Sequence, residues 1–173
     1  MRGLVASLVG ALLLAALSTF GDFVWARFVH AHRAVFGLVH GTLLLLALGL
    51  YLGLLRKRPR AGALGGALVG FLAAASFYAL APLLGYAAMF LSWMALWVGF
   101  GFLDARLRGG ARHREALARG LLAALGSGLA FYAISGIWTT PGGPRYAYNF
   151  FCWTIAFLPG FAALLLRRPR RAG

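Results

Sequence analysis

A stretch of 18 uncharged residues, 86–103, constrains the fold more than any other part of the chain. It reads YAAMFLSWMALWVGFGFL and ends at Asp104, one of only three acidic residues among 173. The hydrocarbon core of a bilayer is about 30 Å thick, and an α-helix needs roughly 20 mainly apolar residues to cross it. The stretch therefore predicts a transmembrane helix.

The composition extends this prediction to the whole chain. Hydrophobic residues make up 62% of the chain and charged residues only 12%, whereas about a quarter of the residues of a soluble domain are charged. The net charge of +14 comes from basic residues placed between apolar runs, where such residues orient a membrane protein and meet anionic headgroups. We expect no nucleic-acid partner, because binding one would need a soluble basic face.

The apolar runs and their breaks predict an all-α membrane protein, with six transmembrane helices in one compact domain covering residues 1–173. The expected spans are 3–24, 34–55, 61–81, 84–103, 116–137 and 146–166. Pro82 should break the third span and make an antiparallel hairpin of the third and fourth, and the turn TTPGGP at 139–144 should precede the sixth. We expect the first run to be retained, because its signal-peptide cleavage motif is weak.

The polar segment 104–119 is expected to lie partly as a short interfacial helix. Within it, Glu115 and Arg119 have the i, i+4 spacing of a helical ion pair.

The distribution of cations predicts the orientation. With six spans, 14 of the 17 Lys and Arg residues fall at the two termini and in the connections after the second and fourth spans. Only Arg27, Arg33 and Arg145 fall on the other side. The positive-inside rule therefore places both termini in the cytoplasm. Because Arg greatly outnumbers Lys and Ala, Leu and Gly are abundant, as in GC-rich bacterial genomes, we expect a bacterial cytoplasmic membrane.

Glycines recur at four-residue spacing on two of the predicted helices. Gly37, Gly41, Gly49 and Gly53 share a face of the second helix, and the set 62, 66 and 70 shares a face of the third. Small residues at this spacing allow helix backbones to approach closely in a membrane. We expect these faces to pack within the chain; the alternative is that they join two copies into a homo-oligomer.

The ionisable residues provide little for catalysis, and we expect neither an enzyme nor a cofactor. The acids lie at helix ends or in connections, and no span carries one near its centre. The lone Cys152 cannot form an intrachain disulfide. His30, His32 and His40 fall near Asp22 at the outer ends of the first two helices. These four residues leave two interpretations open: a metal or haem site, or hydrogen bonding at the membrane interface.

Two segments resemble the insulin-induced gene (Insig) family of membrane proteins. The run LWVGFGFLDARLRGG resembles the family's tryptophan-bearing fourth helix, and FYAISGIWTTPGGPRYAYNFFCWTIAFLPG is similar to its fifth helix, turn and sixth helix. The triplet His40-Gly41-Thr42 lies where the family has a Gly-Thr-rich second helix. The resemblance implies a non-catalytic lipid sensor with an intramembrane cavity for an oxysterol or, in a bacterium, a diacylglycerol-like lipid.

The same resemblance implies a partner-binding role for Asp104, which corresponds to a functional aspartate at the cytosolic end of the family's fourth helix. The other interpretation is an interfacial ion pair of Asp104 with Arg106 or Arg108. Aromatic residues deep in the spans would form the walls of a lipid cavity among helices 1, 3, 4 and 5. Asn149 or Tyr132 would orient a lipid hydroxyl. The predicted ligand-binding residues are Phe77, Tyr78, Trp93, Trp97, Phe131, Tyr132 and Asn149.

A protein of a different class remains the alternative. A small-solute transporter, or the substrate-binding membrane subunit of one, would also have about six helices and little charge. Such a protein needs a water-accessible polar path, which this sequence barely supplies.

Overall fold

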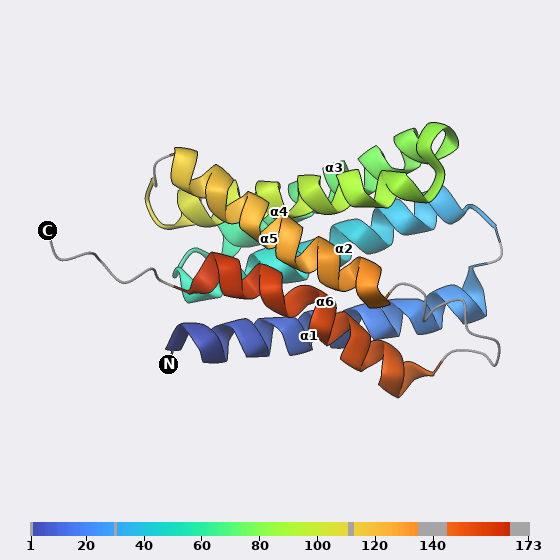
Figure 1. Ribbon diagram of the computed structural model, residues 1–173, viewed down its shortest axis with the longest axis horizontal. Helices are drawn as coiled ribbons and strands as arrows, with labels where there is room; N and C mark the ends of the chain where they lie inside the picture. The colour runs from blue at the N-terminus through green and yellow to red at the C-terminus, as the bar shows by residue number, and fades with distance from the viewer. Residues whose placement is uncertain (1, 30, 111–112, 135–144, 167–173) are drawn as a thin grey trace, which may run out of the picture.

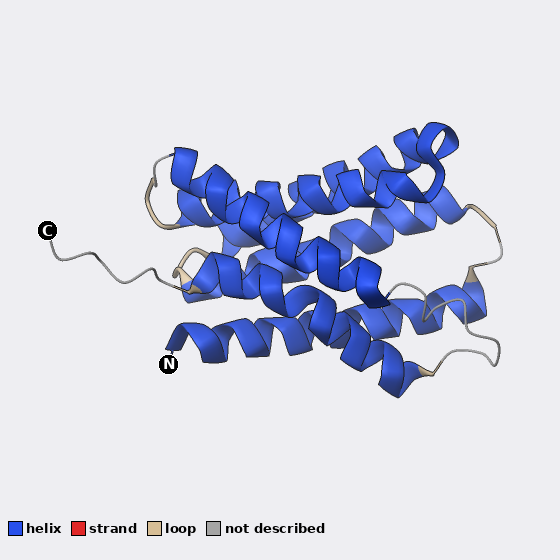
Figure 2. Cartoon of the chain, in the orientation of Figure 1, coloured by secondary structure: helices blue, strands red, loops and turns tan. Residues whose placement is uncertain are grey.

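The computed structural model is a bundle of α-helices (Figure 1). It describes residues 2–29, 31–110, 113–134 and 145–166. The helices are α1 (Arg2–Phe28), α2 (Arg33–Leu55), α3 (Pro59–Leu84), α4 (Ala88–Leu107), α5 (His113–Ile134) and α6 (Tyr146–Leu165), with a short 3-10 helix η1 (Gly85–Ala87). The part of the chain that the structure describes contains no strand (Figure 2), as the apolar, alanine- and leucine-rich composition predicts.

Five helical stretches are long and apolar enough to cross a membrane, among the residues that the structure describes. The longest of these, Pro59–Leu107, has 49 residues and comprises α3, η1 and α4. It folds back on itself at η1, because Gly99 of α4 contacts Val69 of α3 and the hydroxyls of Ser76 and Ser92 lie 3.2 Å apart. The architecture is compatible with a multi-pass integral membrane protein.

The break between α3 and α4 differs from the prediction in position. Pro82 lies inside α3, in its last turn, and the helix continues to Leu84. The turn is made instead at Gly85, whose φ of +56° is a left-handed conformation that favours glycine.

The polar segment after α4 also differs from the prediction. Residues 104–107 continue α4, and residues from His113 onward form the first turns of α5. These residues are therefore not a separate interfacial helix. The described part of α5 ends at Ile134, so the expected end of the fifth span at residue 137 and the turn at 139–144 lie outside the described residues.

Glycine pairs α2 with α3. A Cβ added to Gly49 would overlap the carbonyl oxygen of Gly62 and lie 2.6 Å from the Cα of Gly66. A Cβ on Gly53 would lie 3.1 Å from the Cα of Gly62. The two glycine faces therefore pack on each other within the chain.

The first and last helices pair along their lengths. α1 packs chiefly on α6, while α2 packs chiefly on α3. As a result, the start of α1 and the end of α6 lie at one end of the bundle, together with the α2–α3 and α4–α5 connections (Figure 1). We call this the terminal end and the opposite end the far end.

Candidate ligand cavity and charged cluster

A cavity of about 240 Å³ lies among α1, α2, α3, α4 and α6, in the half of the bundle toward the far end. It is partly open to the surroundings of the bundle. Aliphatic residues and glycines form much of its wall, including Leu44, Leu45 and Ala73. Aromatic side chains form most of the rest: Trp25, Phe77, Tyr78, Trp93, Trp153 and Phe157. Apolar walls with few polar groups are typical of pockets for small apolar ligands.

Three polar side chains besides the Tyr78 hydroxyl and the indoles reach the cavity wall: Ser18, His40 and Ser92. Ser92 donates to the carbonyl of Ala88 at 3.1 Å. The imidazole of His40 stacks on Phe36 with ring centroids 6.1 Å apart. The Ser18 side chain is buried, and its hydroxyl has no hydrogen-bond partner among the described residues. Since a buried hydroxyl normally finds a partner, Ser18 has hydrogen-bonding capacity to offer a ligand.

Beside this cavity, Asp22 joins α1 to α6. Its Oδ2 accepts hydrogen bonds from the Nδ2 of Asn149 at 3.1 Å and from the Nε1 of Trp153 at 2.8 Å. Gly21 lies against His40, because a Cβ on Gly21 would overlap the imidazole ring. These contacts bring α1, α2 and α6 together around a carboxylate at the far end.

The structure separates the seven predicted ligand-binding residues into two groups. Phe77, Tyr78 and Trp93 line the cavity, and the remaining residues, Trp97, Phe131, Tyr132 and Asn149, are not part of its wall. The cavity differs from the expected enclosure by helices 1, 3, 4 and 5 in three helices, since α2 and α6 contribute to the wall and α5 does not.

Close packing explains why α5, Trp97 and Asn149 are not part of the cavity wall. The ring centroid of Phe131 lies 4.9 Å from that of Trp93, so α5 fills the space behind the cavity wall. Trp97 is fully buried and lies against Gly160, where any side chain on the glycine would overlap the indole. The Asn149 amide, expected to meet a ligand hydroxyl, donates to Asp22 instead.

Asp104 lies inside a charged cluster at the terminal end. Its side chain is 0% exposed, and its Oδ1 lies 2.9 Å from both the Nε and the Nη2 of Arg56 on α2. Its Oδ2 lies 3.0 Å from the Nη2 of Arg108, the C-cap residue of α4, four positions further along the chain. The ion pair with Arg108 is one of the two alternatives that the sequence offered, whereas the contact with Arg56 was not foreseen. Asp104 is not presented at the surface for a partner.

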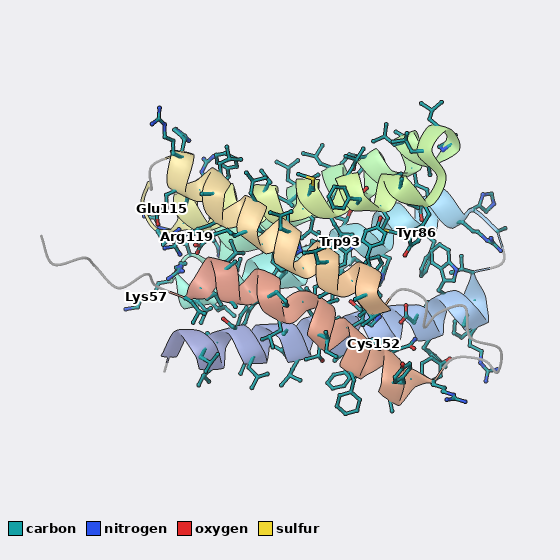
Figure 3. The ribbon with its side chains drawn as sticks, viewed as in Figure 1. Lys57, Tyr86, Trp93, Glu115, Arg119 and Cys152 are labelled. Carbon is teal, nitrogen blue, oxygen red and sulfur yellow. The ribbon has the colours of Figure 1, made fainter. Side chains whose placement is uncertain are left out.

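The cluster extends to α5 and α6. Glu115 lies 3.0 Å from Arg119, which confirms the predicted i, i+4 pair, and 3.7 Å from Arg108. An Nη1 hydrogen bond of 3.1 Å joins Arg119 to the carbonyl of Leu164 near the end of α6. Figure 3 shows Glu115 and Arg119 side by side at the terminal end. Four ion pairs and the hydrogen bond from Arg119 to Leu164 thus connect the ends of α2, α4, α5 and α6.

The described part of the chain contains no cluster of residues suited to bind a metal ion. No three His, Cys, Asp or Glu side chains there lie close enough to hold an ion. His30, one of the candidate ligands, lies outside the described residues. Cys152 is buried and is not disulfide-bonded.

Sequence reasoning missed Ser18 and the contribution of α2 to the cavity. One signal was present, because Ser18 and Asp22 are four residues apart in an otherwise apolar helix and therefore share a face. No equivalent signal marks Leu44 or Leu45, which read as ordinary lipid-facing or core leucines.

Comparison with known proteins gives no match: no protein-family model, no curated protein and no solved structure is significantly similar to this chain.

Proposed function

We propose that this protein is a non-catalytic lipid-binding sensor of the membrane, similar to the Insig family, that holds a sterol-like or diacylglycerol-like lipid in the cavity between α1, α2, α3, α4 and α6. The observation that carries the proposal is the pairing of an aromatic and aliphatic wall with the unpartnered, buried hydroxyl of Ser18. A lipid hydroxyl would satisfy Ser18 while its apolar body filled the remaining space.

Six membrane crossings are part of the proposal, with α3 and α4 each crossing once. The α2–α3 turn and the ends of α4 and α5 at the terminal end carry most of the described cations, including Lys57, Arg60 and Arg114. This asymmetry supports a cytoplasmic location for the terminal end and an external location for the far end.

The chemistry of the wall favours a neutral ligand. Its described lining residues include no Lys, Arg, Asp or Glu, so nothing there would compensate a buried charge on the ligand. Asp22 accepts hydrogen bonds beside the cavity, and a carboxylate at this position repels an anionic headgroup. A lipid alcohol meets both conditions.

The cavity volume indicates partial enclosure. At about 240 Å³ it is slightly smaller than the roughly 300–1,000 Å³ of typical small-molecule pockets. A ligand would place its hydroxyl end and adjoining apolar segment in the cavity and extend the rest through the open side. Burial of that segment supplies about 25 cal/mol per Å² before ordering costs.

Native mass spectrometry of gently purified protein tests the proposal. We expect one neutral lipid per chain to co-purify. Leu44→Trp should reduce the retained lipid at least tenfold by filling the cavity, since Leu44 lies in its wall. Ser18→Ala should reduce it severalfold through loss of one hydrogen bond.

The matched control for the tryptophan variant is Leu64→Trp, because Leu64 is 74% exposed on α3 and lies outside the cavity wall. It should retain the wild-type amount of lipid. Ser7→Ala is the control for Ser18→Ala, since the Ser7 hydroxyl already donates to the Gly3 carbonyl. Retention of only bulk phospholipid in variable amounts, or equal retention by Leu44→Trp and wild type, would contradict lipid binding here. Solute flux in proteoliposomes would then favour the transporter.

A further inference from the structure

A second cavity, of about 250 Å³, lies between α1 and α2 in the half of the bundle toward the terminal end. Leu13 and Leu17 of α1 and Leu54 of α2 form its sides. Tyr51 also lines it, but the Tyr51 hydroxyl donates to the carbonyl of Ala6 at 2.6 Å and so is already satisfied. The groove therefore offers a ligand almost exclusively apolar surface.

The dimensions of this groove suit an extended hydrocarbon chain. Its wall on α2 runs from Ala47 to Leu54, a length of about 10 Å at 1.5 Å per residue. Leu54 is 60% exposed and Leu13 is 52% exposed. The groove is thus open along its length, and its end at Leu54 is two residues from Arg56, the first residue of the α2–α3 turn.

That turn holds a lysine in an unusual backbone conformation. Lys57 has φ +57°, in the left-handed region. It follows the C-cap Arg56, and the bonds Arg58 N–H to Gly53 O (2.7 Å) and Lys57 N–H to Leu54 O (3.1 Å) are those of a Schellman motif. Glycine is the usual residue at this position, because a side chain there lies too close to the following carbonyl oxygen. The only lysine of the chain thus occupies a position that backbone energetics disfavour.

The cations of the turn are available to an anion. Arg56 is engaged by Asp104. In contrast, Lys57, Arg58 and Arg60 make no ion pair with the acidic side chains of the described chain. Figure 3 shows Lys57 at the terminal end of the bundle. Leu54, at which the groove ends, is three residues before it in the chain.

From this juxtaposition we propose a second lipid site, specific for an anionic glycerophospholipid. Its phosphate would lie at Lys57 and Arg58, and one acyl chain would lie in the groove between α1 and α2. Charge complementarity selects a headgroup with net negative charge over a zwitterionic one. The site would lie in the cytoplasmic leaflet under the orientation proposed above, and it does not depend on the ligand of the first cavity.

Lipid titration followed by native mass spectrometry, with thermal unfolding in detergent as a second readout, tests this site. The probes are phosphatidylglycerol and phosphatidylcholine with identical acyl chains. We expect phosphatidylglycerol to bind more tightly and to raise Tm. Lys57→Asn should weaken its binding about fivefold, the ratio that corresponds to the ~1 kcal/mol of one cation near an anionic headgroup. Asparagine is suitable because it is neutral and tolerates a positive φ.

Three comparisons keep the test specific. Ala47→Phe should weaken phosphatidylglycerol binding while leaving every cation in place, because it fills the groove. Arg114→Gln, at a cation in the first turn of α5, should leave binding unchanged. Leu44→Trp should also leave it unchanged, so failure of the first site and failure of this one are distinguishable.

The site is refuted if phosphatidylcholine binds as tightly as phosphatidylglycerol, or if Lys57→Asn binds phosphatidylglycerol like the wild type. Equal losses in Lys57→Asn and Arg114→Gln would show general attraction to a basic surface and would also overturn it. Because asparagine adopts a positive φ at lower cost than lysine, the Tm of Lys57→Asn without lipid should equal or exceed that of the wild type. A loss of binding in that variant therefore cannot be attributed to unfolding.

Discussion

Asp104 shows how one buried carboxylate can stabilise the contact between two helices. It is fully enclosed and lies 2.9–3.0 Å from guanidinium nitrogens of Arg56 and Arg108, which are 23% and 25% exposed. Because the carboxylate is buried and its partners are near the surface, removing its charge leaves two cations crowded together, one of which also faces Glu115. The cluster therefore belongs to the structural core of the terminal end.

We expect Asp104→Asn to lower the free energy of unfolding by about 3 kcal/mol, the low end for breaking a buried ion pair, because both arginines retain access to solvent. Glu115→Gln is the matched change at an acid that is 47% exposed, and it should cost less than about 1 kcal/mol. Thermal unfolding in detergent measures both. Equal, small losses in the two variants would show that the Asp104 cluster contributes no more than a surface pair.

At the scale of single residues, the sequence predicts one of the two arginine partners of Asp104. Arg108 is one helical turn away, so its pairing with Asp104 follows from spacing alone. Arg56 is 48 residues away, and its approach depends on how α2 crosses α4, which local pattern does not determine. Asn149 illustrates the same limit, because its partner Asp22 is 127 residues away. The sequence correctly marks Asn149 as a side chain that needs a partner, but not which partner.

At the scale of helices, glycine determines which surfaces approach most closely. Gly49, Gly62 and Gly66 bring the backbones of α2 and α3 into direct contact. Close approach increases dispersion contacts, which drive helix association in a membrane where the hydrophobic effect between helices is weak. The four-residue glycine repeat was visible in the sequence, so this helix pair could be predicted. The turn at Gly85 could not, since Pro82 is a stronger local signal.

Gly49→Ala should lower the free energy of unfolding by about 1–3 kcal/mol, as expected for overpacking, because the new Cβ would overlap the Gly62 carbonyl. Gly128→Ala provides the contrast within α5, since its nearest neighbour, a Phe90 ring atom, would be 3.9 Å from the added Cβ. That variant should gain about 0.5–1 kcal/mol from higher helix propensity. Denaturation of both in one detergent measures the difference, and a neutral Gly49→Ala would contradict the backbone contact.

At the scale of the whole molecule, the proposed orientation in the membrane is based on which end of the bundle holds most of the cations. Arg60 is the second residue of α3, at the terminal end, and Arg33 is the first residue of α2, at the far end. Both residues are exposed, so cysteines at these positions are suitable reporters. The alternation of ends could be predicted from the apolar runs, whereas the pairing of α1 with α6 could not, because neither helix carries a glycine repeat like that of α2 and α3.

In a Cys152→Ala background, Arg33→Cys should react with a membrane-impermeant maleimide in intact cells, and Arg60→Cys should react only after permeabilisation. The background change removes the single native thiol, which is buried. Labelling of Arg60→Cys but not of Arg33→Cys in intact cells would overturn the cytoplasmic location of the terminal end. Labelling of both positions in intact cells would contradict the proposed number of crossings.

The pairing of the first helix with the last has a consequence for biosynthesis. The hydrogen bonds from Asn149 and Trp153 to Asp22 join residues that leave the ribosome far apart in time. At about 5–20 residues per second, the 127 residues between Asp22 and Asn149 take about 6–25 s to synthesise. Throughout that interval the Asp22 carboxylate must do without these two donors. The contact between α1 and α6 can therefore form only after α6 has been synthesised, later than the contact between α1 and α2.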